Sequence, residues 1–212
     1  MDTEQLIRTL SADAARPALP MARAWSLAAG AAFVVAAAVF FIAIGPRPDI
    51  AAAAETPRFL FKFVVTLTLL GTAFLALKSL ARPGASVPSV LPMLLLAPAL
   101  LLVAAGLEMM VVPVDELRQR WIGSNAMLCM TFIPLIGIGP LAAFLVALRH
   151  GAATRPELAG AVAGLVSGGL AATFYAAHCF DDSPLFVATW YPLAIAILVI
   201  AGALAGRTFA RW

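Results

Sequence analysis

The segment SNAMLCMTFIPLIGIGPLAAFLVAL, residues 124–148, contains no charged side chain from end to end. A helix needs roughly 20 consecutive apolar residues to cross the hydrocarbon core of a bilayer. This segment therefore predicts a membrane-spanning helix. The whole chain is 63% hydrophobic and only 12% charged, a composition that leaves too few polar side chains to cover a water-soluble fold.

Five further apolar segments are long enough to span a membrane. Charged residues, prolines or turn-rich sequences separate them from one another. Together with the first segment, they predict an all-α integral membrane protein with six transmembrane helices, at Ala24–Ile44, Phe59–Leu80, Pro88–Val112, Ser124–Leu148, Leu158–His178 and Leu185–Ala205.

The distribution of Lys and Arg predicts which side each loop faces. Positive residues near the spans are retained in the cytoplasm. With the N-terminus inside, the cytoplasmic loops hold more of them than the outer loops, so both termini are expected to be cytoplasmic. The net charge is only +3. We therefore interpret the basic residues as topology signals and expect no direct nucleic-acid binding.

The chain divides into a short leader, residues 1–23, and a six-span membrane domain, residues 24–212. Within the leader, Leu6, Ile7 and Leu10 share one face of a predicted amphipathic helix. Two interpretations remain open for this helix. It either lies on the inner leaflet or inserts its apolar face into a groove of a soluble partner.

The fifth predicted span carries Gly160, Gly164 and Gly168 at four-residue spacing. Small residues in this pattern allow two membrane helices to approach closely. We expect a helix-packing role for them. The pattern is compatible with packing inside one chain or between two copies, so it leaves the oligomeric state open.

The chain lacks the motifs of common enzymes, namely HExxH, the Walker loop, the dinucleotide fingerprint and GxSxG. We therefore expect no enzymatic activity. Glu108 is the main ionisable residue within a predicted span, and it lies near the outer end. It is expected to reach the outer surface or to accept a hydrogen bond. The shortage of charges near the bilayer centre disfavours a metal or solute transporter.

The only two cysteines, Cys129 and Cys179, fall at the outer ends of consecutive predicted spans. His178, Asp181 and Asp182 surround the second cysteine and, with Glu108, are candidate metal ligands or supports of such ligands. Their spacing matches no standard zinc motif. A zinc or heavy-metal site, a permanent disulfide and a reversible disulfide therefore all remain open.

The run RHGAATRPELAGAVAGLVSGGLAATFYAAHCFDDSPLFVATW, residues 149–190, closely resembles the NrsF family of bacterial membrane anti-sigma factors, the negative regulators of sigma F. Cys129 followed by Pro134-Leu135 matches the family's first cysteine, and Cys179 within residues 178–184 matches its second. The Leu6-Ile7 leader matches more loosely. The resemblance implies that the protein sequesters an extracytoplasmic-function sigma factor at the inner membrane.

The resemblance also implies release of the sigma factor when Cys129 and Cys179 react with an oxidant or a heavy metal. One mechanism is that bridging the two sulfurs pulls together the open outer end of the helix pair that carries them. A membrane thiol oxidoreductase would use the same two cysteines to transfer electrons, and remains the main alternative. No CxxC motif supports it.

Overall fold

The structure is a computed structural model that describes residues 2–14, 20–84 and 87–209. Within these ranges the chain forms helices, turns and short connections, and no strand. The helices in chain order are α1 (Thr3–Ala14), α2 (Met21–Ala43), α3 (Ile50–Ala53), α4 (Pro57–Leu80), α5 (Val87–Val111), α6 (Val114–Ile122), α7 (Ala126–Leu148), α8 (Pro156–Ala176) and α9 (Pro184–Phe209).

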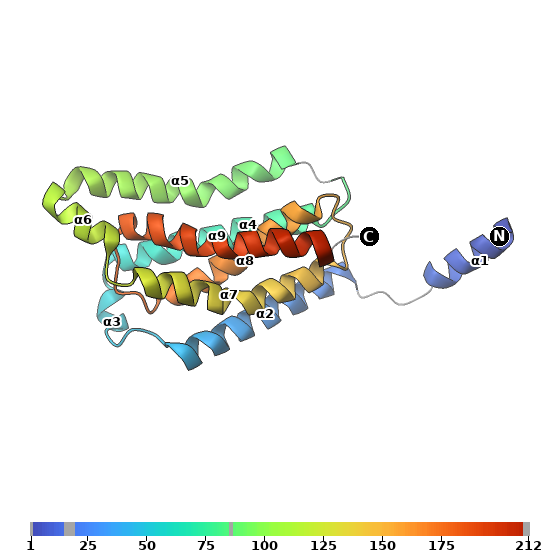
Figure 1. Cartoon of the computed structure of the whole chain (residues 1–212), viewed down its shortest axis with the longest axis horizontal. Coiled ribbons are helices and arrows are strands. Elements are labelled where there is room, and N and C mark those ends of the chain that lie inside the picture. The colour runs from blue at the N-terminus through green and yellow to red at the C-terminus, as the bar shows by residue number, and fades with distance from the viewer. Residues whose placement is uncertain (1, 15–19, 85–86, 210–212) are drawn as a thin grey trace.

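Six of these helices, α2, α4, α5, α7, α8 and α9, are long and apolar enough to cross a membrane. They run roughly side by side in one bundle (Figure 1). The predicted all-α, six-span fold is thereby confirmed. Two boundaries differ from the prediction in a way that matters for the site. Helix α8 ends at Ala176, two residues before the predicted end, so His178 joins Cys179 outside the helix, and a separate helix α6 connects α5 to α7.

Helix α8 forms the centre of the bundle. It packs against α9, α4 and α7, and also touches α2. Helix α8 can contact several helices at once because it is rich in glycine, alanine and serine, whose small side chains let neighbouring helices approach closely from several directions. In its most apolar window, 72% of the residues are buried inside the bundle, compared with 22–44% for the other five spans.

The glycines of α8 lie directly against α9 within the same chain. Gly160 faces Gly202 and Gly206, so that both helices contribute glycine to the contact. A Cβ atom added at Gly164 would stand 2.6 Å from the Cα of Val199, and one at Gly168 would clash with the side chain of Ile195. In this structure the glycine pattern therefore joins two helices of one molecule.

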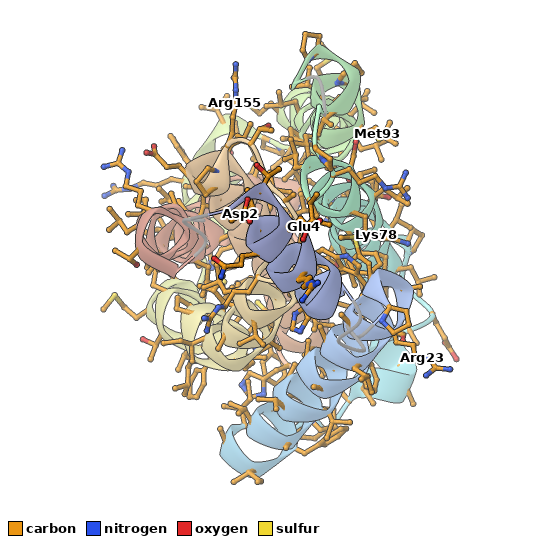
Figure 2. All side chains as sticks on the ribbon, turned by 90° about the vertical axis from the view of Figure 1, so that its right-hand side faces the viewer. Asp2, Glu4, Arg23, Lys78, Met93 and Arg155 are labelled. Atoms are coloured by element: carbon orange, nitrogen blue, oxygen red, sulfur yellow. The ribbon has the colours of Figure 1, made fainter. Side chains whose placement is uncertain are left out.

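The bundle has two distinct ends. We call the end with α3, α6 and the α8–α9 connection the loop end, and the opposite one the basic end. Helix α1 stands beyond the basic end (Figure 1). An end-on view shows Arg23, Lys78 and Arg155 around this end (Figure 2). In α1, Leu6 and Ile7 are 41% and 60% exposed, whereas the side chain of Leu10 lies outside the described part.

Candidate functional site

The connection between α8 and α9, residues 177–183, contains Cys179, and we call it the cysteine loop. Its first turn closes on the last turn of α8, since the backbone N–H groups of His178 and Cys179 donate to the carbonyl of Tyr175 at 2.9 and 3.0 Å. Its last residue, Ser183, accepts from the N–H of Val187 in α9. The loop is thus fixed at both ends by the two helices that it joins.

Two cations hold the middle of the cysteine loop. Lys62 Nζ in α4 donates to the Cys179 carbonyl at 2.8 Å, and Arg47 Nη1 donates to the same oxygen at 3.4 Å. Both also pair with Asp182, at 2.6 Å from Lys62 and 3.2 Å from Arg47. Lys62 is only 1% exposed. A buried charge persists only with such partners, so this cluster anchors the loop to α4.

Arg47 also joins the site to the segment after α2. Its guanidinium donates two hydrogen bonds to Asp49, both at 2.7 Å. This hydrogen bonding raises the pKa of Arg47 above its usual value and lowers the pKa of the Asp49 carboxyl. Both groups therefore remain charged at neutral pH. His178 of the cysteine loop also contacts this segment, since its Nδ1 lies 2.9 Å from the Gly45 carbonyl.

Asp181 connects the cysteine loop to the beginning of α7. Its Oδ2 accepts from the backbone N–H groups of Ser124 and Asn125 at 2.9 and 2.8 Å, and from Asn125 Nδ2 at 2.9 Å. The chain can approach this closely because Gly123 has φ +60° and no Cβ, which would stand 2.8 Å from Asp181 Cγ. The residue that follows Cys179 by two positions thus holds the helix that carries Cys129.

Glu108 connects the loop to α5. Its Oε2 accepts from Ser183 Oγ at 2.6 Å and from the N–H of Leu185 at 3.1 Å, while Arg58 and Arg120 lie 3.8 and 3.7 Å from Oε1. Glu108 is 6% exposed. Of the two expectations for Glu108, the structure shows the accepted hydrogen bond, since the buried carboxylate accepts from Ser183 and lies close to two arginines.

Taken together, these contacts make the cysteine loop the meeting point of the membrane-crossing helices. It continues α8 into α9, and its side chains and carbonyls bond to α4, α5, the start of α7 and the segment after α2. A displacement of this short loop would therefore act on the ends of all six spans.

Both cysteines are free thiols, and both side chains are completely buried. Cys129 lies in the first turn of α7, where its N–H donates to the Asn125 carbonyl at 2.8 Å. Tyr175 lies beside both thiols and donates its hydroxyl to the same carbonyl at 3.4 Å. Both thiols therefore lie buried within the bundle, whereas the mechanism drawn from the sequence placed them at an open outer end of a helix pair.

The electrostatic surroundings of Cys179 are mixed. Burial raises the pKa of its thiol, and the positive charge of Lys62 partly opposes this shift. The thiol itself lies 3.7 Å from the Asp181 carbonyl, to which it can donate. In the folded protein Cys179 is thus held as a neutral, shielded thiol.

The candidate metal ligands are engaged elsewhere. Asp181, Asp182 and Glu108 are held by α7, by Lys62 and Arg47, and by Ser183, and His178 faces Gly45. Among the described residues no group of three or more His, Cys, Asp or Glu side chains is arranged to hold a metal ion. The residues present do not fit a structural zinc site, which takes four protein ligands, but they do offer two neighbouring thiols for chemistry.

Lys62 and Arg47 belong to the candidate site, although from the sequence they were interpreted only as topology signals. Lys62 falls inside an apolar span, and an ionisable residue in that position is a recognised signal of a functional site. Arg47 carries no comparable signal, since it lies in a connecting segment next to proline.

Comparison with known proteins gives a consistent assignment. A family model described as negative regulator of sigma F, NrsF, matches residues 10–212. The chain is 36% identical to the anti-sigma-F factor NrsF of Caulobacter vibrioides and 31% identical to a probable anti-sigma-F factor NrsF of Azospira oryzae, and both alignments cover all of each chain. No solved structure matches the chain significantly.

Proposed function

The chain belongs to the NrsF family of negative regulators of sigma F, and from this premise we propose that it is a membrane anti-sigma factor. In this proposal it sequesters an extracytoplasmic-function sigma factor at the bacterial inner membrane. It releases this partner when Cys129 and Cys179 react with an oxidant or a heavy metal. The observation that carries the proposal is the cysteine loop, which bonds to the ends of the other spans while it holds a buried thiol.

The proposed orientation places the loop end in the periplasm and the basic end, with both termini, in the cytoplasm. The cations Arg23, Lys78 and Arg155 at the basic end support this orientation (Figure 2), since positive residues near the spans are retained inside. The two thiols then lie at the periplasmic end of the bundle, and the periplasm is a compartment in which disulfides persist. The sigma factor is bound on the other side of the membrane.

The proposed signal begins as a change in the distance or bonding of the two sulfurs. Cys179 shares its backbone with the carbonyl that Lys62 and Arg47 hold, and Cys129 lies one turn after the residues that Asp181 holds. A disulfide between them would pull on both sets of contacts. Reversing a two-state equilibrium from 1:99 to 99:1 takes about 5.5 kcal/mol, and a disulfide typically contributes about 2–4 kcal/mol before its redox driving force is added.

The proposed partner contact is the leader helix α1. It stands beyond the basic end, on the side proposed to face the cytoplasm (Figure 1). Its Leu6 and Ile7 side chains are exposed, as the anchors of a helix that binds in a groove must be. Leu10 completes the same apolar face in the sequence.

The test is co-purification from membranes. The full chain is co-expressed with each extracytoplasmic-function sigma factor of its source genome and isolated under reducing conditions, then after exposure to hydrogen peroxide or Cd²⁺. Retention followed by release is the expected result. Cys129→Ser and Cys179→Ser should retain the sigma factor and fail to release it, whereas Leu6→Asp combined with Ile7→Asp should fail to retain it. Absence of retention under every condition would refute the proposal.

A further inference from the structure

The chain has two tyrosines and two cysteines, and all four lie together. Tyr175 and Tyr191 have ring centroids 5.9 Å apart, and each lies beside the thiol of Cys179. Cys129 completes the cluster, and none of the four residues is more than 2% exposed. They come from α7, α8, the cysteine loop and α9, so the fold brings them together from separate elements.

The two tyrosine hydroxyls have different surroundings. Tyr175 donates to the Asn125 carbonyl at 3.4 Å. The Tyr191 hydroxyl is buried and, among the described residues, no group accepts from it in hydrogen-bonding geometry. The polar side chain next to it is the thiol of Cys179. A buried donor without an acceptor is unfavourable, and such exceptions in a protein interior call for an explanation.

The protonation state of the Cys179 sulfur explains why the Tyr191 hydroxyl has no acceptor. A neutral thiol is a weak acceptor, and Cys179 lies 3.7 Å from the Asp181 carbonyl, to which its proton can be donated. A thiolate is an anionic acceptor, and hydrogen bonds to anions are short and strong. Deprotonation of Cys179 would therefore give the Tyr191 hydroxyl the partner that it lacks. Lys62 and Arg47, on the carbonyl of the same cysteine, place positive charge nearby.

We propose that Tyr191 stabilises the anionic sulfur of Cys179 and thereby makes Cys179, rather than Cys129, the thiol that reacts first. Tyr191 is a positioning residue in this proposal. The inference rests on the proposed function, because it assigns an order to the thiol chemistry of the same site.

The chemical step is written for a hydroperoxide as the oxidant. The Cys179 thiolate attacks the distal oxygen, an S–O bond forms, the O–O bond breaks, and the leaving oxygen takes up a proton. The sulfur loses two electrons and the peroxide gains them. The Cys129 sulfur then attacks the Cys179 sulfenic acid, an S–S bond forms, the S–O bond breaks, and the departing hydroxide leaves as water with the Cys129 proton.

The test measures alkylation of the full-length protein in detergent with iodoacetamide. In a Cys129→Ser background, Tyr191→Phe should lower the rate at Cys179 about tenfold, the change expected for one lost charge-assisted hydrogen bond. It should also move the midpoint of the rate-against-pH curve upward. Tyr175→Phe is the matched control. It should change the alkylation rate and the midpoint of the pH curve less, because the Tyr175 hydroxyl already has an acceptor.

The pH curve includes contributions from other groups around Cys179. These are Lys62, Arg47, His178, Asp181, Asp182, Tyr175 and, in the parent, Cys129. They are the same in Tyr191→Phe and in its Cys129→Ser background, so the difference between these two proteins isolates the Tyr191 hydroxyl.

A loss of folding would not explain the expected result, because removing a buried hydroxyl without an acceptor should leave the protein at least as stable. A second measurement needs no substitution. In the reduced parent protein, mass spectrometry at short times should find Cys179 alkylated before Cys129. Equal rates in Tyr191→Phe and its background, or earlier labelling of Cys129, would overturn the inference. Neither readout depends on a sigma factor, so its failure is distinguishable from failure of the proposed function.

Discussion

Replacing Gly164 by alanine should destabilise the bundle by forcing α8 and α9 apart. The added methyl group would stand 2.6 Å from the Cα of Val199, whereas ordinary contact begins at 3.4 Å. It would also clash with the carbonyl oxygen of Leu198. Both obstacles are backbone atoms and cannot rotate away. Overpacking of this kind costs about 1–3 kcal/mol, which corresponds to a melting temperature lower by roughly 2–12 °C in a protein of this size.

The matched control is Gly71→Ala in α4. Gly71 is also inside a transmembrane helix, but among the described residues no atom beyond the backbone of its own helix lies within 4 Å of the position of a Cβ. Alanine favours helix over glycine by up to about 1 kcal/mol, so this variant should be neutral or stabilising. Thermal unfolding of the two purified variants in the same detergent measures the difference. If Gly164→Ala melts with the parent or with Gly71→Ala, the proposed close contact between α8 and α9 is wrong.

Three further predictions concern the cysteine loop. Asp181→Ala removes the hydrogen-bond acceptor at the start of α7 and should lower the unfolding free energy, measured by denaturation in detergent, by about 1–2 kcal/mol. Asp181→Asn, which keeps an acceptor oxygen, should be closer to the parent in this experiment. Lys62→Met should lower the unfolding free energy by about 1.5–3 kcal/mol, because the Cys179 carbonyl loses a charged donor and Asp182 loses one of its two cationic partners. Lys62→Arg, which keeps the positive charge, should recover part of this loss of stability. Because burial raises the pKa of the Cys179 thiol, its alkylation at pH 8 should be slower than that of an exposed thiol and should increase as the pH rises to 10. A rate equal to that of free cysteine at pH 8 would contradict this.

The sequence predicted the spans well because hydropathy is a local property. Each of the six expected segments overlaps one of the long helices, and α7 begins only two residues after the predicted start. Residues 178–183 were also singled out from the sequence as a candidate site. Their carboxylates and imidazole suggested metal ligands. In the structure Asp181 instead accepts from the residue before α7, Asp182 pairs with Lys62, and the His178 imidazole lies against the Gly45 carbonyl.

The partners of these residues could not be predicted, because they are far away in the chain and depend on which way each helix faces. Lys62 lies 117 positions before Cys179, and Arg47 lies 135 positions before Asp182. Hydropathy does not specify how a nearly uniform apolar helix is rotated. The same limitation applies to Gly202 and Gly206 of α9, whose spacing matches that of the α8 glycines but becomes informative only once the two helices are known to be neighbours.

The central position of α8 has a consequence for how the protein is inserted into the membrane. With a mean hydropathy of 1.5, its apolar window is the least hydrophobic of the six, and it is also the one that its neighbours enclose most fully. On its own, such a glycine-rich segment would gain little from contact with lipid. Helix α9, which contributes one wall of its enclosure, is synthesised afterwards. Insertion of α8 should therefore depend on the completion of α9, and a chain that ends before Pro184 should be an early target of membrane proteases.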